Sequence, residues 1–491
     1  MQRALLRVWL SVLFALCCVS AVLASSLVTK EPVSVPPTLK NVKALRVLDI
    51  RSSIIHEDIG IRAKNIDDKP VDNYYFTVPA PIVEHIASMK AFLRQEPQTS
   101  LVITPVGLDL QKQVHQYKVK LDKPLQPNED IRFGIKLSYT HLLKPLPAKI
   151  PQVARQHLFF AGNVYLFSPY FTEEMKTTLM LPNSNIVSYT GGQGIVTKTN
   201  NKIVYGPFRD IPAESSEALT CHFEYLKPVL SVKDLRRELE VSHWGGNLAV
   251  EEHYELHHDG AELEEPFSRV RFQLSRMVHS QTNVLQELKL RLPFEARDVY
   301  YRDEIGNVST SHFRNEKDSS VLEIKPRYPL FGGWNYTWYH GYNVDLPQFV
   351  HYSKKTGKYI LNVKFVENTN DMALDKVQLR VVLPEGATNI EIDAPFEFDS
   401  IKHGKHFTNF DSTGRYLLVL EKSNVIHEHE QFVQIMYEYP TIRLLQKPLV
   451  ASAALLSLFL LSIIISKMTF SIGTKELGVA LVESRPDKIL E

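Results

Sequence analysis

The stretch IRFGIKLSYT, residues 131–140, alternates apolar and polar side chains with a period of two. Ile131, Phe133, Ile135, Leu137 and Tyr139 would lie on one face of a strand, and the polar residues between them on the other. The same alternation recurs at residues 117–121, 288–292, 359–365 and 433–439. Pro and Gly turn signals, such as LPNSN and LFGGW, lie between these segments. Many short strands separated by turns predict β-sandwiches.

A strand that runs into Leu-Pro, crosses a short loop and resumes its alternation occurs three times. The copies are TTLMLPNSNIVSY (177–189), LKLRLPFEARDVYY (288–301) and VQLRVVLPEGATNIEI (377–392). Proline cannot donate to a strand ladder, so each strand should leave its sheet at this point. The repetition indicates related sandwich units.

One segment has a helical period. In APIVEHIASMKAFLRQE, residues 80–96, the apolar side chains Ile82, Ile86, Met89 and Leu93 form one stripe. We expect a helix here that covers a sheet.

The chain has 491 residues, more than one hydrophobic core usually serves. A boundary at Lys227-Pro228, before a new strand-rich segment, predicts β-rich domains at 25–228 and 229–447. The formal net charge of +1 gives no electrostatic reason to expect a nucleic-acid or an acidic partner.

The N-terminus has the layout of a secretory signal peptide. Arg3 and Arg7 precede an apolar run from Val8 to Leu23, and small residues follow around Ala24. We expect residues 1–24 to be removed after export; the alternative is an uncleaved membrane anchor.

A second apolar run, PLVASAALLSLFLLSIIIS, covers residues 448–466 without a charge. A helix of this length spans a bilayer core of about 30 Å at about 1.5 Å per residue. With an exported N-terminus, the topology is single-pass type I, residues 467–491 forming a short cytosolic tail. The serines at 452, 457, 462 and 466 offer contact points for neighbouring spans, which predicts a docking element and not a reaction site.

The exported part cannot form an intramolecular disulfide bond. Cys17 and Cys18 lie in the signal peptide, which leaves only Cys221. We expect Cys221 to be buried and inert, since no basic neighbourhood is evident.

Two histidine clusters resemble zinc-binding motifs but do not complete them. HEHEQ at 427–431 has Gln431 where a second ligand belongs, and HYELH at 253–257 lies in a strand pattern. Residues four apart on a strand are about 13 Å apart, too far for one metal ion. We expect solvated strand faces at both places, and no metal or cofactor.

The chain also lacks a G-x-S-x-G elbow, a Walker loop and a dinucleotide-binding fingerprint. Trp244, Trp334 and Trp338 lie beside glycines, which would suit either an aromatic platform for sugar or peptide or, more commonly, packing in a sandwich core. These observations favour a non-catalytic membrane subunit or receptor.

Two triplets have the form of acceptors for N-linked sugar, Asn307-Val-Ser and Asn335-Tyr-Thr. We expect Asn307 on the turn of a hairpin between residues 300–301 and 310–313, where Gly306 permits the bend. Both triplets fall on the side of the span that is exported.

Long fragments of this sequence closely resemble the ribophorin I family. They are YTHLLKPLPAKI (139–150), YGPFRDIPA (205–213), VSHWGGNLAVEE (241–252), YYRDEIGNVSTSH (300–312), PRYPLFGGW (326–334), VVLPEGATNIEIDAPFE (381–397) and MTFSIGTK (468–475). The resemblance runs from about residue 40 to about residue 475.

The resemblance implies a large single-span subunit of the endoplasmic-reticulum oligosaccharyltransferase. That complex transfers a preassembled glycan from dolichyl diphosphate to Asn in Asn-x-Ser/Thr. The family's role is accessory: a different, many-spanning subunit holds the metal-dependent active site, and the lumenal domains organise the complex and handle nascent polypeptide. Asn307 matches the family's glycosylated position, whereas Asn335 matches no fixed acceptor.

The resemblance does not extend to the long cytosolic helical portion with which animal members contact the ribosome or translocon; the 25 residues 467–491 are similar to the tails of fungal-type members. Two other hypotheses stay open at this point. One is a lumenal enzyme such as a zinc peptidase of related sandwich architecture. The other is a lumenal chaperone or receptor that binds nascent chains or glycans.

Overall fold

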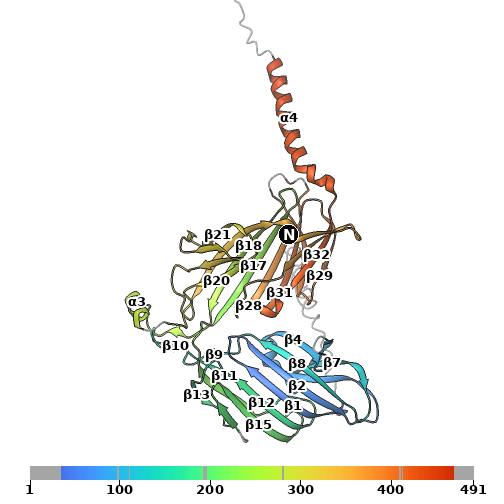
Figure 1. The fold of residues 1–491 in the computed structure, drawn as a ribbon, viewed down its shortest axis with the longest axis vertical. Helices are drawn as coiled ribbons and strands as arrows, with labels where there is room; N and C mark the ends of the chain where they lie inside the picture. Colours follow the sequence, from blue (N-terminus) through green and yellow to red (C-terminus); the bar gives the residue numbers. More distant parts are fainter. Residues whose placement is uncertain are drawn as a thin grey trace, which may run out of the picture.

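Strands dominate the chain, and they gather into two sandwiches stacked end to end (Figure 1). The structure is a computed structural model that describes residues 35–96, 99–109, 111–191, 196–278, 281–408, 411 and 413–468. The signal peptide expected at 1–24 and the tail from 469 onward lie outside the described residues. The predicted class, mainly β with one C-terminal apolar helix, is confirmed.

The first sandwich packs one large sheet against two smaller ones. The large sheet has the order β14 (Val196–Thr199), β15 (Lys202–Ile211), β12 (Thr172–Met180), β1 (Leu39–Asp49), β2 (Ile55–Asn65), β8 (Asp130–Tyr139), β4 (Ile86–Leu93) and β5 (Ser100–Leu101). The smaller sheets are β13 (Ile186–Tyr189), β16 (Ala218–Glu224), β11 (His157–Asn163) and β9 (Lys144–Pro145), and β3 (Val71–Pro79), β7 (Val114–Leu125) and β6 (Ile103–Asp109). A single hydrophobic core, which runs in sequence from Leu39 to Val229, takes residues from all three sheets.

The second sandwich is built in the same way. Its large sheet has the order β30 (Ser400–His406), β31 (Arg415–Val425), β28 (Ala373–Val382), β17 (Leu230–Ser242), β18 (Asn247–His258), β25 (Asn335–Asp345), β21 (Arg297–Asp303) and β22 (Gly306–Asn307). The smaller sheets are β29 (Thr388–Asp393), β32 (Phe432–Glu438), β27 (Lys358–Lys364) and β26 (Val350–Ser353), and β20 (Leu288–Leu292), β24 (Ser320–Ile324) and β23 (His312–Asn315). Its core runs from Leu230 to Tyr437.

The two sandwiches are structural duplicates, because their strands follow one another in the same chain order and occupy the same sheet positions. In each, the first strand pairs antiparallel with the second and parallel with a strand far along the chain: β1 with β12, and β17 with β28. The remaining strands correspond in the same way, sheet by sheet.

Two of the three Leu-Pro repeats mark equivalent places in the duplicates. β12 ends before Leu181-Pro182 and leads to β13, and β28 ends before Leu383-Pro384 and leads to β29. In both, the chain leaves the large sheet and joins the small four-stranded one. The third repeat, at 288–301, joins β20 of the three-stranded sheet to β21 of the large sheet, so it occupies a different position.

The prediction of a helix over residues 80–96 is wrong. Only Ala80–Val83 form a helix, α2, and Ile86–Leu93 form the strand β4. β4 pairs with β8 along its length, from Ile86 opposite Tyr139 to Leu93 opposite Phe133. The backbone N–H and C=O groups along one edge of β8 form hydrogen bonds with residues 86–93. This tertiary pairing outweighs the helical spacing of the apolar residues in the local sequence.

Contacts from several elements hold the sandwiches together. β10 (Lys149–Ile150) of the first pairs in parallel with β19 (Glu262–Leu263) of the second. His141, which follows β8, binds Asp375 through Nε2 at 2.6 Å, and its Nδ1 lies 3.6 Å from Asp259. Glu428 accepts hydrogen bonds from Ser88 and Ser138 at 2.6 and 2.7 Å.

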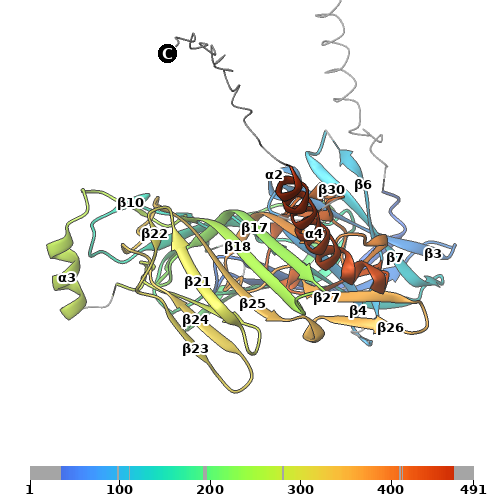
Figure 2. The same cartoon turned by 90° about the horizontal axis from the view of Figure 1, so that it is seen from above.

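Helices are few among the described residues. Besides α2 they are α3 (Arg269–Val278), the short 3₁₀ turns η1 (Leu346–Gln348), η2 (His427–His429) and η3 (Thr441–Leu445), and α4 (Gln446–Lys467). α4 contains the whole span expected at 448–466 and projects away from both sandwiches (Figures 1 and 2). It is long and apolar enough to cross a membrane, and none of its residues is buried.

Candidate functional site

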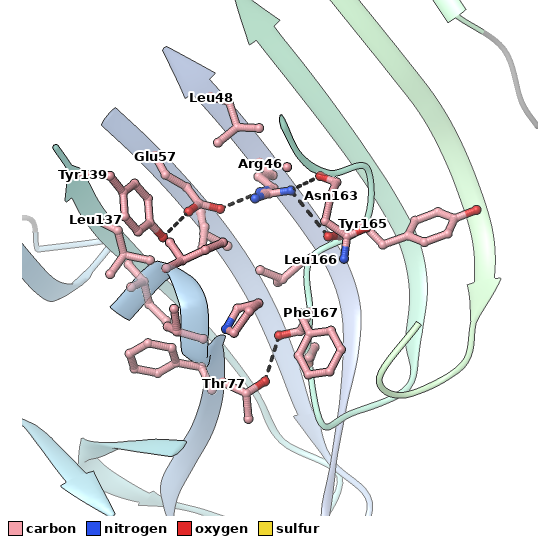
Figure 3. A pocket seen from close by; sticks show the side chains of 18 of the residues that line it. Arg46, Leu48, Glu57, Thr77, Leu137, Tyr139, Asn163, Tyr165, Leu166 and Phe167 are labelled. Atoms are coloured by element: carbon pink, nitrogen blue, oxygen red, sulfur yellow. Dashed lines mark hydrogen bonds and ion pairs between the residues drawn. The ribbon is translucent and has the colours of Figure 1, made fainter. Parts of the chain in front are cut away.

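A cavity of about 370 Å³ lies inside the first sandwich, between the large sheet and β3 and β11 (Figure 3). Strands β1, β2 and β8 supply its walls on one side, and β3 and the segment 160–168 supply them on the other. Most of the lining is aliphatic or aromatic, for example Ile61, Phe76, Ile135, Leu137 and Phe160. This is the size and polarity of a pocket for a small apolar group.

One ion pair lines the cavity. Arg46 of β1 and Glu57 of β2 bind each other through Nε and Oε1, and the Tyr139 hydroxyl donates to the other Glu57 oxygen at 2.6 Å. Nη1 of Arg46 donates to the carbonyl oxygens of Asn163 and Tyr165 (Figure 3). The pair therefore ties the segment after β11 to the large sheet.

These contacts leave the cavity's polar groups engaged with the protein itself. Thr77 donates to the carbonyl of Phe167 at 3.0 Å, so the same segment is bound from β3 as well. The ion pair carries no net charge, and burial together with the Glu57 carboxylate raises the pKa of Tyr139 well above its usual value. Such a site is suited to an apolar ligand and offers little to a sugar, which needs many hydrogen-bonding partners.

The second sandwich fills the corresponding space with larger side chains. The two sandwiches can be compared by aligning β1 with β17 and following the strand pairings outward from them. In this alignment Ile61 corresponds to Tyr254, Ile135 to His340 and Leu137 to Tyr342. All three larger residues are buried. Tyr254 stacks on Trp338 with ring centroids 4.7 Å apart, and burial lowers the pKa of His340 to about 3, which keeps its ring neutral.

An ion pair recurs in the second sandwich. Arg46 lies opposite Thr177 of β12, and Arg237 lies opposite Leu379 of β28, four residues before the Leu-Pro step in each case. Nε of Arg237 is 3.1 Å from Glu252, and Nη2 is 3.3 Å from Glu367. Arg237 and Glu252 are only 3% and 2% exposed, so this pair is fully enclosed.

Sequence reasoning missed both ion pairs, although a signal was present. Arg46 has the strand parity of the buried Ala44 and Leu48, and Arg237 has that of the buried Leu235 and Leu239. A charged residue at an inward-facing strand position indicates a buried partner.

Asn307 is exposed, as an acceptor for sugar requires. It lies on β22, opposite Arg302 of β21, so the turn itself is formed by Glu304 and Ile305. Arg302 donates to the side-chain oxygen of Asn307 at 2.7 Å, and not to the nitrogen that would carry a glycan. The expected hairpin is therefore correct for its first strand only, because His312–Asn315 form β23 and pair with β24 in a different sheet.

Asn335 is also exposed, but it begins β25 in the middle of the large sheet. It lies opposite His257 of β18, whose ring nitrogen Nδ1 contacts the Asn335 side-chain oxygen. Its backbone carbonyl accepts a hydrogen bond from Tyr328 at 3.1 Å. The carbonyl of Asn307 likewise accepts a hydrogen bond, from Nη2 of Arg327 at 3.1 Å, so both asparagines are held at the side chain and at the backbone.

The histidine clusters have different surroundings. His253 and His257 lie on β18, as the alternation predicted, and are partly exposed. The expected strand at 427–431 is wrong: His427–His429 form the turn η2. His429 is buried, accepts a hydrogen bond from the Ile426 amide at 3.2 Å, and has a pKa lowered by burial to about 4.

The three tryptophans do not form one platform. Trp338 is buried, Trp334 packs against Phe331 and Phe267 at one side, and Trp244 is exposed on the turn between β17 and β18. Cys221 is buried, as expected, and burial raises the pKa of its thiol to about 12. Within the described ranges, no group of three or more His, Cys, Asp or Glu side chains is placed to hold a metal ion.

The sequence model of the family described as Ribophorin I matches residues 39–466 of the chain. This chain belongs to the ribophorin I family. The match covers both sandwiches and ends inside α4.

Curated relatives bear consistent names. The chain is 36% identical to dolichyl-diphosphooligosaccharide–protein glycosyltransferase subunit 1 of Caenorhabditis elegans, over 74% of this chain and 62% of the worm protein. It is 32% identical to subunit 1B of Oryza sativa subsp. japonica, over 91% of this chain and 95% of that protein. It is also 32% identical to subunit 1A of Arabidopsis thaliana, over 88% of this chain and 70% of that protein.

Two solved structures are each similar to part of the chain. Yeast LTA4 hydrolase aligns with a TM-score of 0.27 and 10% identity, covering 41% of this chain and 31% of that chain. An M1 zinc metallopeptidase from Deinococcus radiodurans aligns with a TM-score of 0.25 and 11% identity, covering 44% of this chain and 50% of that chain. Likenesses this weak say nothing about the chemistry of the ribophorin I family.

Proposed function

We propose that this chain is a non-catalytic accessory subunit of an oligosaccharyltransferase in the membrane of the endoplasmic reticulum. The single observation that carries the proposal is the family match over residues 39–466, with relatives named as subunit 1 of a dolichyl-diphosphooligosaccharide–protein glycosyltransferase. The reaction is transfer of a preassembled glycan to Asn in Asn-x-Ser/Thr.

In this proposal another, many-spanning chain holds the active site, and this chain supplies shape and anchorage. Residues 25–447 lie in the lumen, α4 crosses the bilayer once, and residues 467–491 lie in the cytosol. The apolar surface of α4 supports the anchoring role, because none of its residues is buried against the rest of the chain. Its partners are the catalytic subunit, other subunits of the complex and nascent polypeptide.

Purification of the full chain in a mild detergent tests this proposal. The expected result is near-stoichiometric recovery of a many-spanning glycosyltransferase, while the purified chain without partners transfers no glycan to an acceptor peptide. A matched variant replaces the serines at 452, 457, 462 and 466 by leucine, which keeps the span apolar and should reduce recovery of the partner. Recovery of the chain alone, or transfer by the chain alone, contradicts the proposal.

We also propose that Asn307 carries N-linked glycan and that Asn335 is a second acceptor. Endoglycosidase treatment should increase gel mobility, and Asn307→Gln should remove one step of that shift. Ser309→Ala, which keeps the asparagine and destroys the triplet, should have the same effect. An unchanged mobility shift in both variants contradicts the assignment of Asn307, and Asn335→Gln tests the second acceptor in the same way.

The cavity of the first sandwich favours a second candidate function, capture of an apolar side chain of unfolded polypeptide in the lumen. The network of hydrogen bonds around Arg46, Glu57 and Thr77 leaves the apolar walls as the available surface. Between the two ligands of a lumenal chaperone, peptide and glycan, this surface favours peptide.

A cavity-filling substitution tests this second function. Leu137→Tyr places in the cavity the residue type that the second sandwich has at the equivalent position. Leu45→Tyr, on the outward face of β1, is the matched control. Affinity of the full chain for a fluorescent peptide rich in Leu and Phe should fall by about tenfold or more, or about 1.4 kcal/mol, in the first variant and not in the second. Equal affinities contradict the function.

A further inference from the structure

Four large apolar side chains are exposed around the point where the chain enters α4. They are Trp244, Phe407, Ile442 and Leu445, which are 68%, 65%, 73% and 57% exposed. We call them the helix-entry rim. They come from three separate segments: the β17–β18 turn, the loop after β30, and η3.

The β17–β18 turn is fixed to the approach to α4. His243 stacks on Tyr439, with ring centroids 4.9 Å apart, and its Nε2 lies 2.8 Å from the Tyr437 hydroxyl. Trp244 lines a small cleft together with Leu444 and Lys447. Trp244 therefore lies beside the first turn of the helix.

The loop after β30 is fixed to the same turn of the helix. Asp411 of this loop binds Nζ of Lys447 at 3.1 Å, and Arg415 lies 3.4 Å from Asp411. Phe407 belongs to the same loop and lies against Gly414, where a Cβ atom would meet its ring at 2.7 Å. Two hairpin ends, each with an exposed aromatic residue, are thus tied to the start of α4.

The length of α4 sets the depth of this rim. Its 22 residues span about 33 Å, which is little more than the roughly 30 Å of a bilayer's hydrocarbon core. The helix has no spare turn to lift Lys447 away from the membrane. Groups tied to Lys447 then lie in the headgroup region, where Trp residues are enriched.

Charge on the same surface agrees with this placement. Arg443 lies in η3, Lys447 at the start of α4 and Lys405 near the end of β30, next to the segments that carry the rim, and basic side chains near a membrane bind lipid phosphates. We propose that the helix-entry rim inserts Trp244, Phe407, Ile442 and Leu445 into the bilayer interface, so that the second sandwich rests on lipid headgroups. The proposal rests on α4 crossing the bilayer and goes beyond the subunit role.

Site-specific photo-crosslinking in the assembled complex tests this proposal. The photoreactive residue is introduced as Trp244→p-benzoylphenylalanine and, separately, as Phe407→p-benzoylphenylalanine, both at exposed aromatic positions that tolerate an aromatic replacement. Val187→p-benzoylphenylalanine, on an exposed part of β13 in the first sandwich, is the control away from the rim. Mass spectrometry then identifies whether the adduct is lipid or protein.

Both rim probes are expected to form phospholipid adducts, at a yield at least about fivefold above that of the Val187 probe. Protein adducts at the rim probes, or a yield equal to the Val187 control, overturn the proposal. Probes at residues 455–458, which sample every face of α4, separate the two levels of failure. Lipid adducts at residues 455–458 without any at the rim probes refute only the insertion of the rim into the bilayer interface. If none of the probes, on α4 or on the rim, forms a lipid adduct, the membrane span on which the proposal rests is refuted as well.

Discussion

The two sandwiches follow one topology, yet their interiors differ. The first has a cavity lined by Ile61, Ile135 and Leu137, and the second has Tyr254, His340 and Tyr342 at the corresponding positions. Strand order and register are thus compatible with either interior. The difference lies in the side-chain volume at three inward-facing positions. The backbone hydrogen bonds of the sheets do not depend on that volume.

This contrast separates what specifies the fold from what is free to vary. Both sandwiches keep an arginine on the first strand at the same register with the parallel strand, and both pair it with a glutamate of the second strand. In the first sandwich that pair borders the cavity, and in the second it is enclosed by aromatic side chains. The cavity is therefore a specialisation of one copy, and substitutions in both copies and at the contact between them test the comparison.

The largest effect is expected from Arg237→Met in the second sandwich. This change leaves the carboxylates of Glu252 and Glu367 buried without their cation, at a cost of about 3–5 kcal/mol. Arg46→Met should cost less, because Glu57 keeps the hydroxyl of Tyr139 and the Arg46 side chain is less enclosed, 11% exposed against 3% for Arg237. Unfolding of the full chain by urea, with hydrogen exchange to assign the affected sandwich, measures both. Equal losses of unfolding free energy in the two variants would mean that the tighter burial of the Arg237 ion pair does not make it more important for stability.

Tyr254→Ile gives the second sandwich the residue type of the first. It removes a ring stacked on Trp338 and a hydroxyl that donates to Glu252 at 2.9 Å, and it should cost about 2–4 kcal/mol. The same measurement applies, with faster hydrogen exchange expected in β17 and β18. A loss below about 1 kcal/mol would show that the aromatic filling is dispensable.

The contact between the sandwiches should depend on pH through His141. Asp259 and Asp375 raise the pKa of His141 to about 9 in the folded chain. A raised pKa stabilises the protonated form, so the contribution is complete below about pH 6.5 and is lost as pH rises through about 9. Hydrogen bonds to charged groups are worth about 1.5–3 kcal/mol, and His141→Gln should remove this pH dependence. Thermal unfolding of the unsubstituted chain and of the His141→Gln variant between pH 6 and pH 10 measures this pH dependence. Identical dependence of stability on pH in the two proteins would refute the role of His141.

The smallest effect is expected from Leu137→Tyr in the first sandwich. Because a cavity adjoins Leu137, the larger ring should be accommodated at a cost below about 1.5 kcal/mol, less than usual for overpacking a core. Leu179→Tyr, at a fully buried position outside the cavity lining, is the matched control and should cost more. Equal costs would mean that the cavity does not accept added volume.

Period-two alternation was sufficient to predict the strands at 131–140 and 433–439, because each lies in a sheet with one face buried. The absence of charge from 448 to 466 was sufficient to predict α4. The helix predicted at 80–96 was wrong because the strand β4 is selected by its neighbour β8, which lies far along the chain. Domain limits, the acceptor asparagines and the membrane orientation stay predictions.

The cavity could not have been predicted from the sequence, since it depends on volumes that meet only after distant strands are aligned. Ile61 and Leu137 look like ordinary core residues in their own strands. Arg46 and Glu57 were detectable as charges at inward-facing positions, but their partnership required knowing which strands pair.

The parallel pairing at the centre of each large sheet has a consequence for how the protein is made. β1 is the first of the described strands to be synthesised, but one of its two neighbours, β12, begins only at Thr172, and a similar delay separates β17 from β28. While the chain emerges, one edge of each leading hairpin stays open until more than a hundred further residues have followed. Such unpaired edges fold slowly and invite wrong partners, so each half of this protein needs protection during its own synthesis.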